Sequence, residues 1–166
     1  MKKLPIGIQS FKKIREEDYL YVDKTGIAVD LISRYSYVFL SRPRRFGKSL
    51  FVDTLHHLFE GKKQLFEGLA AERTHDWSKT YPVIRISFSE GSFRSPETLE
   101  QSLLSSIMEN EKRLGVTVET RVPALRFAQL IRGVSEKYDC RTVILIDEYD
   151  KPILDNIDSG EMALEA

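Results

Sequence analysis

The sequence has few of the features that mark secreted and membrane proteins. Its single cysteine, Cys140, cannot form an internal disulfide, which favours a reducing, cytoplasmic location. No apolar run approaches the roughly 20 residues of a membrane-spanning helix, and no apolar segment suitable for a signal peptide follows the N-terminal lysines. Because 25 basic residues balance 25 acidic ones, the overall charge predicts neither a nucleic-acid nor a membrane partner.

The composition is that of one soluble, globular domain. Hydrophobic residues make up 42% of the chain and charged residues 30%, which excludes a disordered or fibrous protein. A length of 166 residues allows a sizeable core. The three histidines, His56, His57 and His75, have no metal-ligand partners at a useful spacing, so we interpret them as surface or structural residues.

A loop ending in Gly47-Lys48-Ser49 is the most informative segment. It follows the β-favouring run that starts at Tyr37, and a helical pattern comes directly after it. In this setting Gly-Lys-Ser indicates phosphate binding by backbone N–H groups and a helix N-terminus. Lys48 would add charge at the β- and γ-phosphates, and the Ser49 hydroxyl would ligate Mg²⁺. The predicted nucleotide-binding residues are Pro43, Arg44, Arg45, Phe46, Gly47, Lys48, Ser49 and Leu50.

A second informative segment, which ends in two acidic residues, lies about a hundred residues further on. The run from Thr142 to Ile146 is continuously apolar and ends in Asp147 and Glu148. Such a run predicts a parallel strand covered on both faces, and ligands bind at the carboxyl ends of these strands. Asp147 would hold Mg²⁺ through water, as a Walker B residue does, and Glu148 would orient and deprotonate the attacking water. The simpler alternative is that both acids cap the next turn.

The remaining pattern alternates helices and strands. Helices are predicted over residues 26–34 and 48–60, from Pro96 to Gly115, and from about Pro123; strands are predicted from Tyr37, over 82–88 and over 142–147. The order implies an α/β fold with a mainly parallel sheet. After Glu148, the sequence has room for one short helix and a tail.

Two groups of residues keep alternative interpretations at this stage. Arg44 and Arg45 either strengthen the positive field at the phosphates or pair with acids on neighbouring segments. Asp23, Lys24 and Thr25 either cap a helix or bring the N-terminal segment against the nucleotide base.

Three segments together resemble the AAA-ATPase-like family of bacterial and archaeal P-loop proteins. They are Leu4-Pro-Ile-Gly7 with Tyr21-Val-Asp-Lys-Thr25, Arg42-Pro-Arg-Arg-Phe-Gly-Lys-Ser49, and Ile146-Asp-Glu-Tyr-Asp-Lys-Pro152. In that family Arg42 is usual where the generic Walker A motif has glycine. The resemblance implies a three-layer P-loop NTPase fold, cut shortly after the Walker B strand. It divides the chain into a segment 1–36 that packs on the core and a partial ATPase domain 37–166.

The resemblance also implies a function. We expect Mg²⁺-dependent ATP binding here, and ATP hydrolysis in a longer protein with Lys48 and Glu148 as catalytic residues and Ser49 and Asp147 as metal ligands. Such ATPases have a later strand carrying a sensor residue, so we expect this chain alone to be marginally stable and inactive. The alternatives are a non-hydrolysing nucleotide-binding module and a non-functional gene fragment. Nucleic acid could be bound through a nuclease-like C-terminal domain of the family, and a homo-oligomer stays an open alternative.

Overall fold

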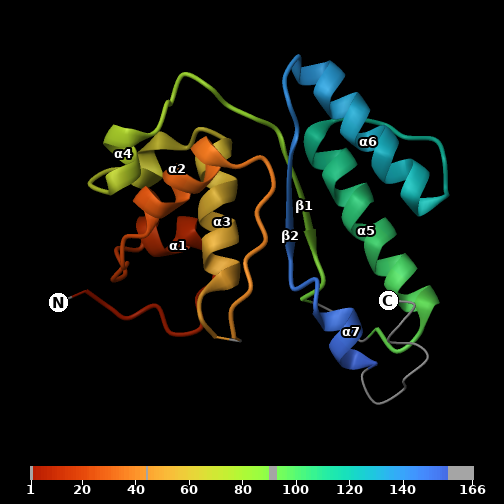
Figure 1. Cartoon of the computed structure of the whole chain (residues 1–166), viewed down its shortest axis with the longest axis horizontal. Helices are drawn as coiled ribbons and strands as arrows, with labels where there is room; N and C mark the ends of the chain where they lie inside the picture. The colour runs from red at the N-terminus through yellow and green to blue at the C-terminus, as the bar shows by residue number, and fades with distance from the viewer. Residues whose placement is uncertain (1, 44, 90–92, 157–166) are drawn as a thin grey trace. The chain divides into compact units, whose positions relative to one another are not determined.

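The structure, a computed structural model, describes residues 2–43, 45–89 and 93–156. The chain forms two compact units, Met1–Thr80 and Tyr81–Ala166, and each is described by itself (Figure 1). The division between residues 36 and 37 that the sequence predicts for functional domains remains a prediction. Among the described residues, no helix has both the length and the apolar character needed to cross a bilayer.

The first unit is helical in its described part. Five described helical elements surround a core to which Phe11, Leu58 and Phe66 contribute fully buried side chains. The predicted helices at 26–34 and 48–60 are confirmed, with small shifts of their ends. The elements are α1 (Phe11–Glu16), α2 (Thr25–Arg34), α3 (Lys48–Phe59), the 3₁₀ helix η1 (Lys63–Phe66) and α4 (Ala70–Thr74).

Helix α3, which follows the phosphate-loop sequence, is anchored on the N-terminal segment. The buried Asp53 carboxylate of α3 accepts a hydrogen bond from the Phe11 N–H at the start of α1, at 2.7 Å. The Phe11 ring packs on Tyr21 and Phe66, with centroids 5.2 Å and 4.9 Å away. These contacts connect α3 to the segments before and after it in the chain. The loop that precedes α3 therefore leads into a helix that is held in place.

The strand predicted from Tyr37 is not observed. Residues 37–40 lie outside any helix or strand, and the side chains of Tyr37 and Val38 are exposed. A strand is stabilised by hydrogen bonds to a neighbouring strand. The one sheet found in the described residues pairs β1 with β2, both of the second unit. An apolar run alone therefore does not produce a strand here.

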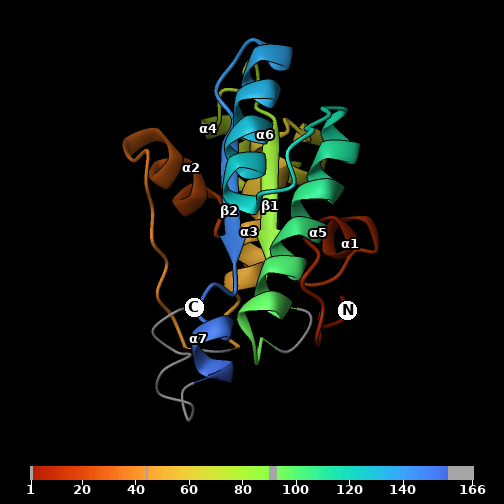
Figure 2. The same cartoon turned by 90° about the vertical axis from the view of Figure 1, so that its right-hand side faces the viewer.

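The second unit is a small α/β arrangement. Strands β1 (Val83–Ser87) and β2 (Val143–Asp147) pair in parallel, with Ser87 opposite Asp147, which confirms the predicted strands and their direction. Helices α5 (Pro96–Leu114) and α6 (Pro123–Tyr138) lie together on one face of this pair (Figure 2). The short helix α7 (Lys151–Asp155) follows β2. The fold is thus compatible with the α/β class.

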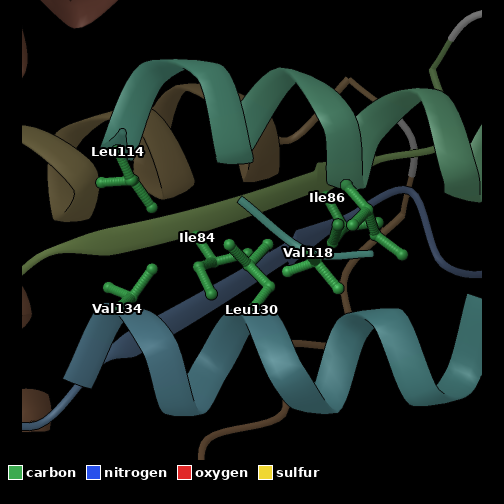
Figure 3. Packing of buried hydrophobic residues seen from close by; sticks show 7 residues of the cluster. Ile84, Ile86, Leu114, Val118, Leu130 and Val134 are labelled. Carbon is green, nitrogen blue, oxygen red and sulfur yellow. The ribbon is translucent and has the colours of Figure 1, made fainter. Parts of the chain in front are cut away.

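A compact apolar core joins the sheet to its two helices (Figure 3). Ile84 and Ile86 of β1 are buried against it, whereas their partners across the ladder, Ile144 and Ile146, remain 38% and 48% exposed. The predicted coverage of β2 on both faces is therefore wrong for the described structure. Helix α5 packs mainly on β1, which leaves β2 less covered. The core residues are Ile84, Ile86, Ile107, Leu114, Val118, Leu130 and Val134.

The outer edge of β1 is closed by side chains of α5. The buried Asn110 amide accepts a hydrogen bond from the Arg85 N–H at 3.0 Å and donates one to the Arg85 carbonyl at 2.7 Å. Arg113 donates to the Val83 carbonyl and to Asn110 Oδ1. Asn110 therefore takes the place of a neighbouring strand on this side, which protects the edge from pairing with another chain.

Replacing Asn110 should destabilise the second unit strongly. We expect Asn110→Leu, which keeps the volume, to lower the free energy of unfolding by about 2–3 kcal/mol, because it removes the partners of two backbone groups at once. Urea unfolding measures this loss. The matched control is Glu109→Ala at the exposed neighbouring position, for which we expect a change within about 0.5 kcal/mol. Equal effects of the two substitutions would contradict the role of Asn110.

Candidate functional site

The loop before α3 is closed by its own lysine. Lys48 Nζ donates a hydrogen bond to the Arg42 carbonyl at 2.8 Å, so the side chain reaches back across the loop to its first residue. Gly47 has φ 75° and ψ 25°, in the left-handed region that favours glycine. A Cβ atom at this position would contact no other atom. Glycine is therefore favoured here by the left-handed backbone conformation and not by close packing. The loop thus turns sharply into the helix at a position occupied by glycine.

The N-terminus of α3 presents backbone donors. Lys48, Ser49 and Leu50 are its first three residues, and the first intrahelical bond at this end runs from the Phe51 N–H to the Gly47 carbonyl, at 3.0 Å. The N–H groups of a first turn have no acceptor within their helix. Gly47 has no side chain that could cap them, so these donors suit an anion at the positive end of the helix dipole.

The other predicted loop residues are exposed where they are described. Arg45 has φ 67°, an uncommon conformation for a residue with a side chain and one that is enriched at functional sites. Both roles considered for Arg45, in the positive field at the phosphates and in pairing with a neighbouring acid, remain predictions. Pro43 and Phe46 are exposed, and Arg44 lies outside the described residues.

The two predicted acids lie at the carboxyl end of β2. Asp147 is the last residue of the strand and is buried, and the Glu148 N–H donates to its Oδ1 at 3.0 Å. Glu148 is half-buried with φ 53°, and its carbonyl accepts from the Lys151 N–H at 3.0 Å. The chain therefore turns at Glu148, directly after the strand, in a left-handed backbone conformation.

Helix α7 holds this turn in place. The Phe93 N–H donates to the Asp155 carboxylate at 3.1 Å, and the Asn156 amide donates to the Phe93 carbonyl. The Lys151 ammonium lies 5.0 Å from the centre of the Phe93 ring. These contacts fix the segment after Glu148, so the turn is supported from both sides.

The donor atoms of the proposed metal ligands suit Mg²⁺. Mg²⁺ prefers hard oxygen ligands and keeps several waters. Asp147 offers a buried carboxylate, of which one oxygen accepts a single described backbone N–H, and an ionised carboxylate has further lone pairs to offer. Ser49 offers a hydroxyl in the first turn of α3. Opposite Asp147, Ser87 is a polar residue of the same strand end that sequence reasoning missed.

The segment Asp23-Lys24-Thr25 forms hydrogen bonds at the starts of helices α2 and α4. Asp23 accepts hydrogen bonds from the Thr25 N–H at 2.8 Å and from the Ala70 N–H at 2.8 Å, and the Ala71 N–H donates to Thr25 Oγ1. Burial alone would raise the pKa of Asp23, but these hydrogen bonds outweigh it and the pKa lies below its usual value. The structure therefore favours the helix-capping interpretation, since Asp23 and Thr25 connect the starts of α2 and α4.

The predicted residues fall into two groups. Residues 42, 43 and 45–50 belong to one loop and helix start in the first unit, and Asp147 and Glu148 share one strand end in the second. The acceptor role of the Arg42 carbonyl could not be read from the sequence, because a backbone oxygen leaves no residue-type signal. A loop with a left-handed glycine before a helix start has the local geometry of an anion-binding class of protein.

Comparisons with known proteins identify the family. Residues 5–166 match the family described as Predicted AAA-ATPase, and the chain therefore belongs to this family. It is similar to a protein of Azotobacter chroococcum mcd 1 described as an uncharacterized protein in the vnfD 5′ region. The two are 52% identical over 165 residues, which cover 99% of this chain and 32% of the relative. No solved structure matches the chain significantly.

Membership confirms the family that the three sequence segments indicate. It supports nucleotide use as the general class of function. The chain spans about a third of the length of the relative it matches. Any activity of a whole protein of that length is therefore a proposal.

Proposed function

We propose that this chain binds Mg-ATP at residues 43–50 and contributes the catalytic residues Lys48 and Glu148 of an ATPase in a longer protein. The observation that supports this most directly is the loop itself. Gly47 is in the left-handed conformation at the α3 N-terminus, and Lys48 is bonded across the loop to the Arg42 carbonyl. Family membership adds support for nucleotide use, and the choice of ATP over GTP rests on it alone.

Each residue has a defined role in this proposal. The first-turn N–H groups of α3 donate hydrogen bonds to the phosphate oxygens, and Lys48 neutralises charge on the γ-phosphoryl group. Ser49 and Asp147 hold the metal ion, Ser49 directly and Asp147 through water. When bound, Mg²⁺ offsets negative charge on the phosphate oxygens. Glu148 orients a water molecule and removes its proton.

The proposal also includes the three-layer fold. We infer that residues 37–40 become a strand when further strands of a longer protein are present, because their side chains are apolar and the run leads directly into the loop. Strand β2 carries partly exposed isoleucines, which fits a strand that gains more cover in a larger sheet. The sensor strand typical of this class would then complete the hydrolytic site.

Thermal unfolding with and without Mg-ATP tests nucleotide binding. Ligand at about 100 times its dissociation constant should raise the free energy of unfolding by about 2.7 kcal/mol if it binds only the folded state. The measurement is made on this chain and on a longer protein of the family that contains it. A shift in either supports a working phosphate loop. Folded protein without a shift in both would reject the proposal.

A further inference from the structure

Helix α3 brings together three potential metal ligands near its C-terminal end. His56, His57 and Glu60 each offer one ligand atom, and these atoms all lie within 4.8 Å of one another. The sequence predicts surface or structural histidines without metal-ligand partners, whereas the structure brings Glu60 close to His56 and His57. One helical turn separates His56 from Glu60, which places both on the same side of α3.

The distance between two of the ligand atoms already fits an ion. His56 Nε2 lies 3.5 Å from Glu60 Oε2. Donor atoms bound to Zn²⁺ at about 2.0–2.1 Å lie about 3.3 Å apart in a tetrahedral site. The His57 ring centre is 5.0 Å from that of His56 at an interplanar angle of 71°. The three ligand atoms therefore lie within reach of one shared ion.

The surroundings add a feature common to metal-binding histidines. The Asp53 carboxylate lies 3.7 Å from His57 Nε2, and the Phe11 N–H fixes that carboxylate at 2.7 Å. A carboxylate beside a ligating imidazole orients the ring and raises its basicity. The side chains of His56, His57 and Glu60 are 14%, 13% and 23% exposed, so the cluster is shielded but reachable from solvent.

Ion pairing alone explains the cluster less well. An ordinary imidazole is mostly neutral at pH 7, so a His–Glu pair four residues apart contributes little to helix stability. The pairs His56–Glu60 and His57–Asp53 each join residues one turn apart, and the ligand atoms of His56, His57 and Glu60 also lie within 4.8 Å of one another. A shared cation gives a single reason for the convergence.

We propose that His56, His57 and Glu60 form a binding site for a divalent transition-metal ion, with Zn²⁺ the best match. Two imidazoles and one carboxylate suit Zn²⁺, and a three-residue set leaves one position for water or another ligand. The site begins roughly 12 Å along the helix axis from Lys48, so it is separate from the proposed Mg-ATP residues. It does not depend on nucleotide binding.

Titration of the tag-free chain with Co²⁺ and Zn²⁺ tests this site. We expect one ion per chain, visible absorption bands on Co²⁺ binding, and displacement of Co²⁺ by Zn²⁺. His56→Gln and Glu60→Gln should each weaken Zn²⁺ binding at least about tenfold, and Asp53→Asn by about 10–100-fold. The matched control is His75→Gln, which also removes a histidine but lies outside the cluster and should leave binding unchanged.

Two results would overturn the proposal. One is the absence of binding by the folded wild-type chain; the other is equal loss of binding in His75→Gln and His56→Gln. The metal-free unfolding of every variant is measured in parallel to detect misfolding. If the variants do not fold, X-ray absorption of the wild-type Zn²⁺ complex decides, since only a first shell with two imidazoles and one carboxylate agrees with the site.

Discussion

Lys48→Ala should remove at least about half of the stabilisation that Mg-ATP provides. A hydrogen bond to a charged group contributes about 1.5–3 kcal/mol, so its loss should weaken Mg-ATP binding by roughly 10–150-fold. At about 100 times the wild-type dissociation constant, the variant should gain about 0.3–1.4 kcal/mol of stability, compared with about 2.7 kcal/mol for the wild type. The Lys48–Arg42 hydrogen bond is also lost, so the nucleotide-free loop becomes less constrained. Thermal unfolding and equilibrium titration measure both effects.

Lys62→Ala is the matched control for this substitution. It removes the same charge from an exposed position just beyond the other end of α3. Its nucleotide-dependent shift should equal that of the wild type. An identical shift in Lys48→Ala would mean that the nucleotide binds elsewhere, and residues 43–50 would no longer be the site.

The helix ends could be predicted from the sequence because capping is local. Ser95 accepts from the Thr98 N–H, Pro96 is the first residue of α5, and Gly115 ends the helix with φ 63°. Each of these signals acts within four residues of the helix end it defines. The start of α3 was predictable for the same reason, since Gly47 and Lys48 adjoin in the chain.

Features that depend on distant partners could not be predicted in this way. The apolar run from Tyr37 resembles a strand, but a strand needs a neighbour that no local pattern supplies. The sequence does not distinguish Asn110 from an exposed helix residue. In the structure its side chain forms hydrogen bonds with the backbone of Arg85, 25 residues away. Its role depends on how α5 packs on β1, which only the three-dimensional structure shows.

The candidate site, too, could be predicted from the sequence only in part. The motifs name Lys48, Ser49, Asp147 and Glu148, and the structure adds the local geometry of each group: the left-handed Gly47, the buried carboxylate and the turn at Glu148. Their joint action on one nucleotide remains a prediction. The spacing of His56 and Glu60 in the sequence is compatible with two metal ligands on one helix. Only the structure shows that His57 lies close to both.

Glu148→Gln should separate binding from turnover in a longer protein of the family that contains this chain. General-base catalysis contributes about 10²–10⁴ in rate, so ATP hydrolysis should fall by that factor. Mg-ATP binding should change little, because the amide has the same shape and the Asp147 contact comes from the backbone N–H, which the substitution keeps. The variant should therefore retain bound ATP, measured by its co-elution with the protein, while phosphate release becomes slow.

The matched control for this prediction is Glu136→Gln, the same chemical change at an exposed position of α6, which should keep wild-type turnover. Loss of turnover in both variants would indicate a general effect on folding and would remove Glu148 as the base. A wild-type protein that binds ATP without measurable hydrolysis, and that Glu148→Gln leaves unchanged, would identify a nucleotide-dependent switch instead of an ATPase. Because both functions would bind Mg-ATP at the same residues, turnover and not binding distinguishes them.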